Sequence, residues 1–175
     1  MSRLSRRTFA ISTLALLAAC GSPPPKQTPA FNRYAGPPVT QVSINKGQRR
    51  MHLLNGSTVL KSYDVSLGNQ PAGHKQFSGD GKTPEGVYFI DRFNPRSAFH
   101  LSVGISYPNP NDRAFAEAYG RDPGGDIFIH GRGPQGNTLF PQQRDWTAGC
   151  IAVTDEEIEE IYAMLMPGTP IVIYP

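Results

Sequence analysis

The amino-acid sequence predicts a mainly β domain, and three observations point to this class. Short runs in which apolar and polar residues alternate recur along the chain from residue 39 onwards. Turn-forming residues separate these runs, and the whole chain has 18 glycines and 17 prolines to supply them. Helical spacing of apolar residues is well specified in one segment, 154–166. We therefore expect strands to form the core, with a helix packed on them.

The first predicted strands are close neighbours in the sequence. Residues 39–45 alternate in polarity, residues 46–48 offer a turn, and residues 51–54 return as a second strand. Asn55-Gly56 then predicts a tight hairpin turn, because Asn and Gly tolerate the positive φ values that such turns need. A third strand follows, with its apolar face carried by alternating residues between 59 and 67.

The remaining strands are spaced more widely. They are predicted over residues 87–90, 99–106, 127–129 and 171–174. Long connections that contain Gly and Pro separate them, over 68–86 and 107–125. Loops of this length in a compact domain are often functional, so we expect these two connections to serve the activity.

One helix is specified at both of its ends. Thr154 is the expected N-cap and Glu157 completes a capping box, with acidic residues at the positive end of the helix dipole. Pro167-Gly168 ends the helix. Its apolar stripe, which we expect to be core, consists of Ile158, Ile161, Tyr162 and Leu165. The helix follows Cys150 closely and is expected to hold the cysteine loop rigidly.

The first 38 residues carry signals for export and anchoring. Arg6-Arg7 precedes a short apolar run that ends in small residues, which predicts a cleaved export signal over 1–19. The paired arginines resemble the twin-arginine export signature, although adjacent arginines also occur by chance in basic signal regions. Leu17-Ala18-Ala19-Cys20 is typical of a lipoprotein cleavage site, so Cys20 is the expected lipidation position. Residues 20–38 are rich in proline and read as a tether.

The balance of charge argues against a nucleic-acid partner. The chain has 17 Lys and Arg against 14 Asp and Glu. Arg3, Arg6 and Arg7 lie in the export signal, so 17 minus 3 leaves 14 basic residues against 14 acidic ones in the mature chain. A balanced domain has no net positive field to attract phosphates. We therefore expect no nucleic acid among its partners.

Cys150 is the main candidate for chemistry. If Cys20 carries lipid, Cys150 has no partner within the chain. An unpaired cysteine in an exported protein is buried and inert, paired between chains, or reactive. His130 ends the apolar run 127–129, where a strand end would place it at the rim of the sheet. An imidazole within hydrogen-bonding reach of a thiol can take its proton and create a nucleophile for acyl transfer.

Glycines beside both residues fit such a site. Gly131 and Gly149 mark positions where the backbone passes close to other groups or takes unusual dihedrals. Amides around Gly149 and Cys150 are expected to face a developing oxyanion. A zinc site would need three or four ligands, and His130, Cys150 and His100 include no close-spaced ligand pair. The sequence therefore predicts a cysteine nucleophile and no metal.

These residues resemble a known family. His130-Gly131 followed by Thr147-Ala148-Gly149-Cys150 looks like the signature of the L,D-transpeptidase catalytic (YkuD) domain. The segment 79–88, with a Thr-Pro-x-Gly turn before a strand, and the closing segment 168–173 are similar to the corresponding parts of that family. The resemblance covers residues 39–175, which we take as the catalytic domain.

The resemblance implies a β-sandwich-like fold with a helix after the catalytic cysteine, a periplasmic peptidoglycan substrate and no cofactor. By position, Cys150 is the nucleophile and His130 the general base and acid, while Thr147, Gly149 and Gly131 shape the loop and the oxyanion site. The thiol would attack the carbonyl on the L side of a meso-diaminopimelate–D-alanine bond in a stem peptide and release D-alanine. The resulting thioester would then pass its acyl group to an amine.

Two positions depart from the family pattern. Ala148 stands where a second histidine is common, and Ala152 where an arginine is common. The segments 146–154 and 104–110 resemble a branch whose members release proteins from peptidoglycan. Hydrolysis of a diaminopimelate–lysine amide, with a peptidoglycan-linked lipoprotein as partner, is therefore an alternative to L,D-transpeptidation. A non-catalytic wall-binding lipoprotein is a third interpretation.

Four further residues are candidates for substrate binding: His100, Tyr107, Arg132 and Arg144. A strand would place the His100 side chain on one face of the sheet or on the other. On the face of the site, His100 would partly replace the histidine that the family commonly has at position 148. The two arginines lie between His130 and Cys150, where they either bind carboxylates of a stem peptide or are simply solvated.

The expected location is the periplasm. Lipid on Cys20 would tie the exported protein to a membrane. The outer membrane is favoured over the inner one, because Gly21 and Ser22 include no acidic retention residue after Cys20.

Overall fold

The computed structural model describes residues 34–139 and 144–175. The export signal predicted over 1–19, the lipidation position Cys20 and most of the tether predicted over 20–38 lie outside these residues. Within the two described ranges, no helix is long and apolar enough to cross a bilayer.

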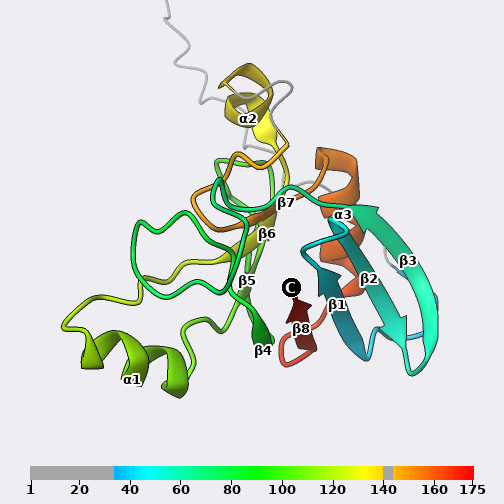
Figure 1. The fold of residues 1–175 in the computed structure, drawn as a ribbon. Coiled ribbons are helices and arrows are strands. Elements are labelled where there is room, and N and C mark those ends of the chain that lie inside the picture. The colour runs from blue at the N-terminus through cyan, green and yellow to red at the C-terminus, as the bar shows by residue number, and fades with distance from the viewer. Residues whose placement is uncertain (1–33, 140–143) are drawn as a thin grey trace, which may run out of the picture.

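Eight strands form one curled sheet, which confirms the mainly β class (Figure 1). The strands are β1 (Gln41–Asn45), β2 (Arg50–Asn55), β3 (Thr58–Asp64), β4 (Gly86–Asn94), β5 (Ser102–Ile105), β6 (Phe128–His130), β7 (Ile151–Ala152) and β8 (Pro170–Tyr174). Their order across the sheet is β3-β2-β1-β8-β4-β5-β6-β7. The pairs β1–β8 and β6–β7 are parallel and the other neighbouring pairs are antiparallel. Strand β4 joins the two halves of the sheet, because it pairs with β8 on one side and β5 on the other.

The predicted helix is α3 (Asp155–Met164), and it contacts β5 and β6. Its capping box is present, with Thr154 and Glu157 bonding each other's backbone N–H groups. Ile158 and Ile161 are fully buried in a core that runs through both halves of the sheet. Full burial of one such side chain stabilises the fold by about 1.5–3 kcal/mol, so this stripe fixes α3 on the strands that carry the candidate site.

Some predictions need correction. The strand predicted over 99–106 begins only at 102, because His100 has a φ of 70° and cannot continue a strand. The connection 107–125 contains α1 (Pro110–Ala118), which Asn109 and Asp112 cap reciprocally. The sequence analysis also did not predict α2 (Gly133–Leu139) or the short strand β7. By contrast, the hairpin turn at Asn55-Gly56 is confirmed, with Gly56 at a φ of 56°.

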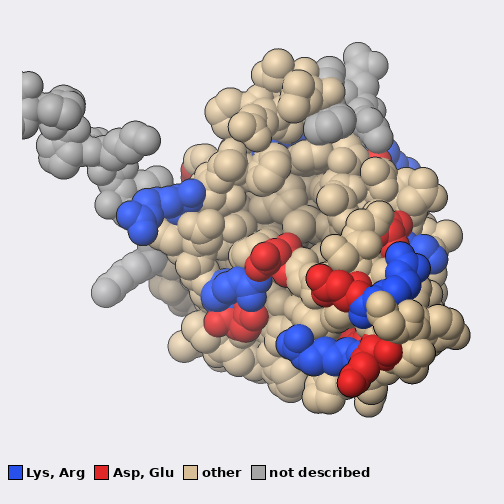
Figure 2. All heavy atoms as spheres, turned by 90° about the vertical axis from the view of Figure 1, so that its left-hand side faces the viewer, with Lys and Arg blue, Asp and Glu red and all other residues tan. Residues whose placement is uncertain are grey.

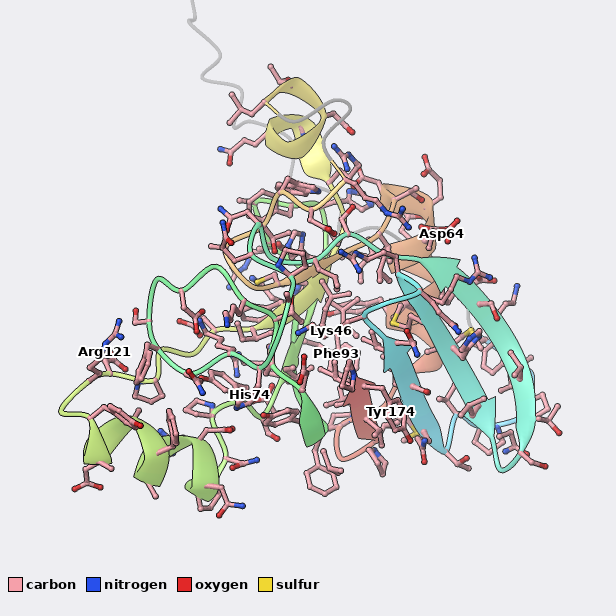
Figure 3. The ribbon with its side chains drawn as sticks, in the orientation of Figure 1. Lys46, Asp64, His74, Phe93, Arg121 and Tyr174 are labelled. Atoms are coloured by element: carbon pink, nitrogen blue, oxygen red, sulfur yellow. The ribbon has the colours of Figure 1, made fainter. Side chains whose placement is uncertain are left out.

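The connection 68–86 is held by buried polar side chains. The Lys46 Nζ donates to Gly73 O at 2.6 Å, Thr83 O at 2.9 Å and Glu85 Oε1 at 2.8 Å. His74 Nδ1 accepts from the Glu85 N–H, and its Nε2 lies 3.1 Å from Asp112 Oδ1. Figure 3 shows His74 beside α1. This connection is therefore tied to β1 and to α1.

A second buried lysine, Lys75, links residues within the same connection, 68–86. Lys75 Nζ donates to Phe77 O at 2.9 Å and to Asp80 Oδ1 at 2.8 Å. The other partners of the Asp80 carboxylate are the backbone N–H groups of residues 76, 77 and 82. Burial opposes ionisation of Asp80, but these hydrogen bonds outweigh it and lower the pKa of the carboxyl from 3.8 to about 2.

We predict that Asp80→Asn destabilises the domain by about 2 kcal/mol at neutral pH, the value that the pKa difference implies. A depressed folded-state pKa stabilises the fold above the unfolded value of 3.8, and this stabilisation is lost as the pH falls toward 2. Urea unfolding of both proteins should therefore differ at pH 7 and converge in acid. The control is Asp64→Asn, at the exposed end of β3 (Figure 3), which should change stability little. Equal unfolding midpoints for Asp80→Asn and Asp64→Asn at pH 7 would contradict this role of Asp80.

Candidate active site

The parallel pair β6–β7 positions both candidate catalytic residues. Ile129 lies opposite Ile151 and His130 opposite Ala152, and both isoleucines are fully buried. Because side chains alternate along a strand, His130 and Cys150 project to the other face from the isoleucines. Cys150 immediately precedes β7 and is offset from His130 by two positions. Strand spacing and rise then place the two Cα atoms on the order of 8 Å apart.

The segment 66–69 holds the other side of the cysteine loop. Ser66 and Ala152 exchange two backbone hydrogen bonds of 2.8 Å. Thr147 donates its backbone N–H to Leu67 O at 3.2 Å and accepts from Asn69 N–H at 2.9 Å. The loop that carries Cys150 is therefore anchored on both sides, by β6 and by this segment.

Gly149 and Thr147 define the turn just before Cys150. Gly149 has a φ of 139°, and a Cβ there would lie 2.7 Å from Lys82 O, so the expected unusual backbone is confirmed. The Thr147 hydroxyl donates to Cys150 O at 2.7 Å and accepts from Gly149 N–H at 3.1 Å. The Gly149 amide is thus occupied within the turn in this geometry, rather than facing an oxyanion.

His130 is the last residue of β6, but its side chain is buried rather than exposed at a rim. Phe99 packs against the ring at 4.7 Å between centroids, and Trp146 lies edge-on at 5.7 Å. Burial lowers the pKa of His130, and the Gly131 carbonyl and the Asp155 charge offset this only in part. Nδ1 lies 2.6 Å from Gly131 O, and a carbonyl only accepts, so Nδ1 carries the proton. The neutral ring therefore keeps a basic lone pair on Nε2.

Asp155 fixes the turn that follows His130. Its Oδ1 accepts the backbone N–H groups of Arg132 and Gly133, each at 2.8 Å. A Cβ at Gly131 would lie 2.5 Å from the same oxygen, which explains the glycine by close approach. The first residue of α3 thereby holds the peptide whose carbonyl orients the His130 ring.

Cys150 is a free cysteine of intermediate exposure. Its Sγ donates to Asp126 O at 3.5 Å. Burial raises the pKa of the thiol, the Asp126 carboxylate adds to this, and the charges of Lys75 and Arg92 oppose it. The directions of the two pKa shifts agree: the resting pair is a neutral thiol and a neutral imidazole. His130 is thus suited to take the proton during attack rather than before it.

The four residues that were predicted to bind substrate differ in where their side chains lie. His100 turns toward α3, where Nε2 lies 2.6 Å from Glu159 Oε1. Tyr107 is buried and donates its hydroxyl to Pro123 O at 2.9 Å. Arg132 packs its guanidinium over Trp146 at 5.2 Å. Arg144 is exposed.

Three residues that support His130 were not predicted from the sequence: Phe99, Trp146 and Asp155. Trp146 lies inside the cysteine motif, and this position was the available signal for it. Asp155 was interpreted only as a partner of the helix dipole. The contact of Phe99 with His130 depends on the turn at His100, and no local pattern in the sequence signals it.

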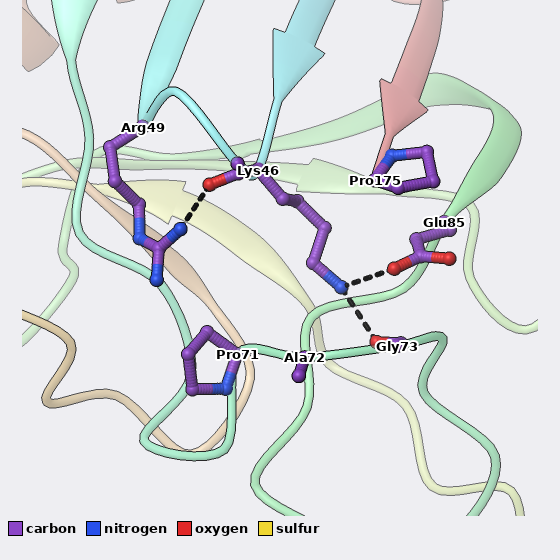
Figure 4. Close-up of a pocket in the computed structure, with 8 residues that line it drawn as sticks. Lys46, Arg49, Pro71, Ala72, Gly73, Glu85 and Pro175 are labelled. Carbon is purple, nitrogen blue, oxygen red and sulfur yellow. Dashed lines mark hydrogen bonds and ion pairs between the residues drawn. The ribbon is translucent and has the colours of Figure 1, made fainter.

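A pocket of about 280 Å³ lies elsewhere, at the ends of β1 and β8 (Figure 4). Its lining includes Lys46, Arg49, Glu85 and Pro175, but not Cys150 or His130. Lys46 is held there by Glu85 and Gly73 O, and Arg49 donates to Lys46 O. Burial lowers the pKa of Lys46, and the Glu85 carboxylate offsets part of this shift. Both basic side chains of the pocket, Lys46 and Arg49, are therefore bonded to other parts of the fold.

Among residues 34–139 and 144–175, no group of three His, Cys, Asp or Glu side chains is arranged to hold a metal ion. The face shown in Figure 2 carries Lys and Arg side chains next to Asp and Glu side chains in small mixed groups.

The sequence matches those of known proteins. The sequence profile of the L,D-transpeptidase catalytic domain, YkuD, matches residues 39–173. The Escherichia coli K12 protein YafK, which carries a provisional L,D-transpeptidase assignment, is 28% identical over 178 residues. That alignment covers 94% of this chain and 65% of YafK, so the chain spans only part of this relative's length.

Solved structures agree on the fold. The helical cell shape determining protein Pgp2 of Campylobacter jejuni matches with a TM-score of 0.57 at 24% identity, over 77% of this chain and 47% of that one. An L,D-transpeptidase of Mycobacterium smegmatis matches with a TM-score of 0.51 at 14% identity, over 77% of this chain and 58% of that one. At these identities the likeness shows the fold alone, and it confirms the expected YkuD-like fold with a helix after the cysteine.

We predict that Cys150 remains a thiol at neutral pH. Because burial raises its pKa, thiolate absorbance in the ultraviolet should appear only above the ordinary cysteine value of about 8.5. The measurement is a pH titration of the wild-type spectrum minus that of Cys150→Ser. A thiolate signal already present at pH 7 would instead indicate a preformed thiolate–imidazolium pair.

Proposed function

The chain belongs to the L,D-transpeptidase catalytic domain (YkuD) family, and we propose that it is a cysteine acyltransferase acting on peptidoglycan stem peptides. The observation that supports this most is the placement of Cys150 and His130 on one face of the parallel β6–β7 pair. The thiol is partly accessible, and the imidazole has its Nδ1 satisfied by Gly131 O. A thiol and an imidazole on one face of two paired strands are placed where a proton can pass between them once the side chains approach during attack.

In the proposed first half-reaction, Cys150 Sγ attacks the carbonyl on the L side of a meso-diaminopimelate–D-alanine bond. The thiol proton passes to His130 Nε2 as the carbon–sulfur bond forms. The oxyanion lies at the cysteine turn, where the Cys150 backbone N–H is the donor, since Gly149 N–H is engaged by Thr147. The carbon–nitrogen bond then breaks, and the imidazolium returns the proton to the D-alanine amine.

The second half-reaction transfers the acyl group. An amine of another stem peptide attacks the thioester, His130 takes its proton, and the thiolate leaves and is reprotonated. Water in place of the amine gives hydrolysis by the same steps. The thioester is therefore shared by a transpeptidase and by an amidase that releases lysine-linked protein, and the acceptor alone separates them.

We also propose that the domain works in the periplasm as a lipoprotein. The support is the sequence of the first twenty residues, which ends in the cleavage-site pattern Leu17-Ala18-Ala19-Cys20. Lipid on Cys20 and the Pro-rich tether over 20–38 then place the catalytic domain a short distance from the membrane, within reach of the wall.

We predict that the purified domain forms a covalent acyl adduct on Cys150 with a tetrapeptide stem, seen by intact mass. Cys150→Ser should form no thioester. His130→Gln should slow acylation by about 10²–10⁴-fold, the usual contribution of a positioned general base. The control is His52→Gln, since His52 lies on β2 and contacts Ser62. Wild-type acylation rates in His130→Gln would refute the assigned base.

The products of the same reaction identify the acceptor. A cross-linked dimer from two stem peptides supports the transferase. Release of a lysine-terminated peptide from a diaminopimelate–lysine conjugate supports the amidase. Absence of any adduct and any product, in a protein that folds, would favour the non-catalytic interpretation.

We predict that Cys20→Ser moves the protein from the membrane fraction to the soluble periplasmic fraction. The lipid on Cys20 supplies the attachment, since two or more acyl chains hold a protein stably on a membrane. Fractionation of cells that express either form, followed by density separation of inner and outer membranes, measures this. Unchanged fractionation would show that Cys20 is not the anchor.

A further inference from the structure

A row of residues crosses the three strands β4, β5 and β6 and ends at Cys150, just before β7. Arg92 on β4 lies opposite Gly104 on β5, and Gly104 lies opposite Phe128 on β6. Ile129 on β6 lies opposite Ile151 on β7 in a parallel pair, so the residues that precede them, Phe128 and Cys150, are also neighbours. Residues opposite each other on neighbouring strands project to the same face. Arg92 and Cys150 are therefore on one face of the sheet, with Gly104 and Phe128 between them.

Gly104 lets the Arg92 side chain lie along this row. A Cβ at position 104 would lie 2.6 Å from Arg92 Cγ and 3.1 Å from Arg92 Nε, so the arginine occupies the space that a side chain would fill. The guanidinium carbon lies 4.5 Å from the centre of the Phe128 ring. Arg92 therefore reaches two strands over, toward the cysteine loop.

The guanidinium meets two carboxylates at this position. Its NH1 donates to Asp91 Oδ2 at 2.6 Å and its NH2 to Asp126 Oδ1 at 3.0 Å. Asp126 is also the residue whose backbone carbonyl accepts from Cys150 Sγ. The charges of Arg92 and Asp126 both act on the thiol, in opposite directions. The pair is thus adjacent to the reacting sulfur.

These side chains are accessible to a ligand. The side chain of Arg92 is 41% exposed and that of Asp126 is 90% exposed. The two ion pairs use one N–H of each terminal guanidinium nitrogen, and each of these nitrogens carries two. Donors therefore remain for a carboxylate, and the exposed Asp126 oxygens can accept from an ammonium.

The combination selects one chemical class. A simple anion would be attracted by Arg92 but repelled by Asp91 and Asp126. A simple cation would be repelled by the guanidinium. A group with an ammonium and a carboxylate on the same carbon satisfies both signs at once. The free end of the diaminopimelate side chain is such a group, while that of lysine has only the ammonium.

We propose that Arg92 and Asp126 form a subsite for the zwitterionic end of the donor's side chain, with Arg92 binding its carboxylate and Asp126 its ammonium. This inference rests on the proposed acyl transfer at Cys150. It explains why a glycine stands at position 104, since a side chain there would displace Arg92. It also provides a guanidinium near the nucleophile in a chain that has Ala152 where the family commonly has arginine.

The test compares two donor peptides that differ only in the third residue, meso-diaminopimelate or L-lysine, and follows formation of the Cys150 thioester by intact mass. For the wild type, we expect a lower KM with diaminopimelate. Arg92→Gln should raise this KM by about 10-fold, a modest effect for a charge-assisted pair at an exposed site, and raise the KM of the lysine donor much less, so that the preference for diaminopimelate is lost. Arg92→Lys should restore part of the loss, because it keeps the charge but not the two-pronged geometry.

Two further variants complete the design. Asp126→Asn should weaken both donors, because both carry the ammonium, and Asn tolerates the φ of 53° found at this position. Arg50→Gln is the matched control, since Arg50 pairs with Asp64 on β2–β3, in the other half of the sheet. If Arg92→Gln still forms the thioester and still prefers diaminopimelate as the wild type does, the subsite is wrong. If no donor acylates the wild type, the proposed function fails first, and this inference fails with it.

Discussion

The backbone pairing of β6 with β7 is the constraint on which the rest of the site depends. It aligns two fully buried isoleucines on one face and leaves His130 and Cys150 on the other. The strand β7 has only two residues, so this pairing alone would fix it weakly. The segment 66–69 supplies a second set of backbone bonds from the opposite side, and α3 covers the buried face. The loop that carries Cys150 is therefore held by backbone hydrogen bonds from two sides.

Burial of this site favours the uncharged form of both reacting groups. The His130 ring lies between Phe99 and Trp146, and desolvation lowers its pKa while it raises that of Cys150. A preformed ion pair would need polar neighbours that offset the loss of hydration. The geometry instead provides a fixed tautomer, because Gly131 O accepts from Nδ1 and Asp155 holds the turn that carries this carbonyl. Orientation of the base, rather than a standing charge, is what the fold contributes.

Local patterns in the sequence predicted most of the strands and α3, because alternation and capping residues act over a few positions. The same kind of signal was present for α1, where Asn109 and Asp112 cap a helix that begins with Pro110, but the prolines and glycines nearby pointed to a loop. Cys150 and His130 could be proposed from the sequence because each lies in a short contiguous motif, Thr147-Ala148-Gly149-Cys150 and His130-Gly131. Arg92, Asp126 and Phe99 could not, since each reaches the site through strand register or a turn that joins distant segments.

The absence of a side chain at position 104 has a consequence for how such domains diverge. A Cβ at this position would lie 2.6 Å from Arg92 Cγ, so the Arg92 side chain would have to leave the place that it occupies beside Phe128. In the proposed subsite, the choice of donor peptide therefore depends on a position in β5 that is outside the Cys150–His130 pair. A single substitution at this position, two strands from Cys150, would then change the peptide that is preferred without replacing either residue of the pair.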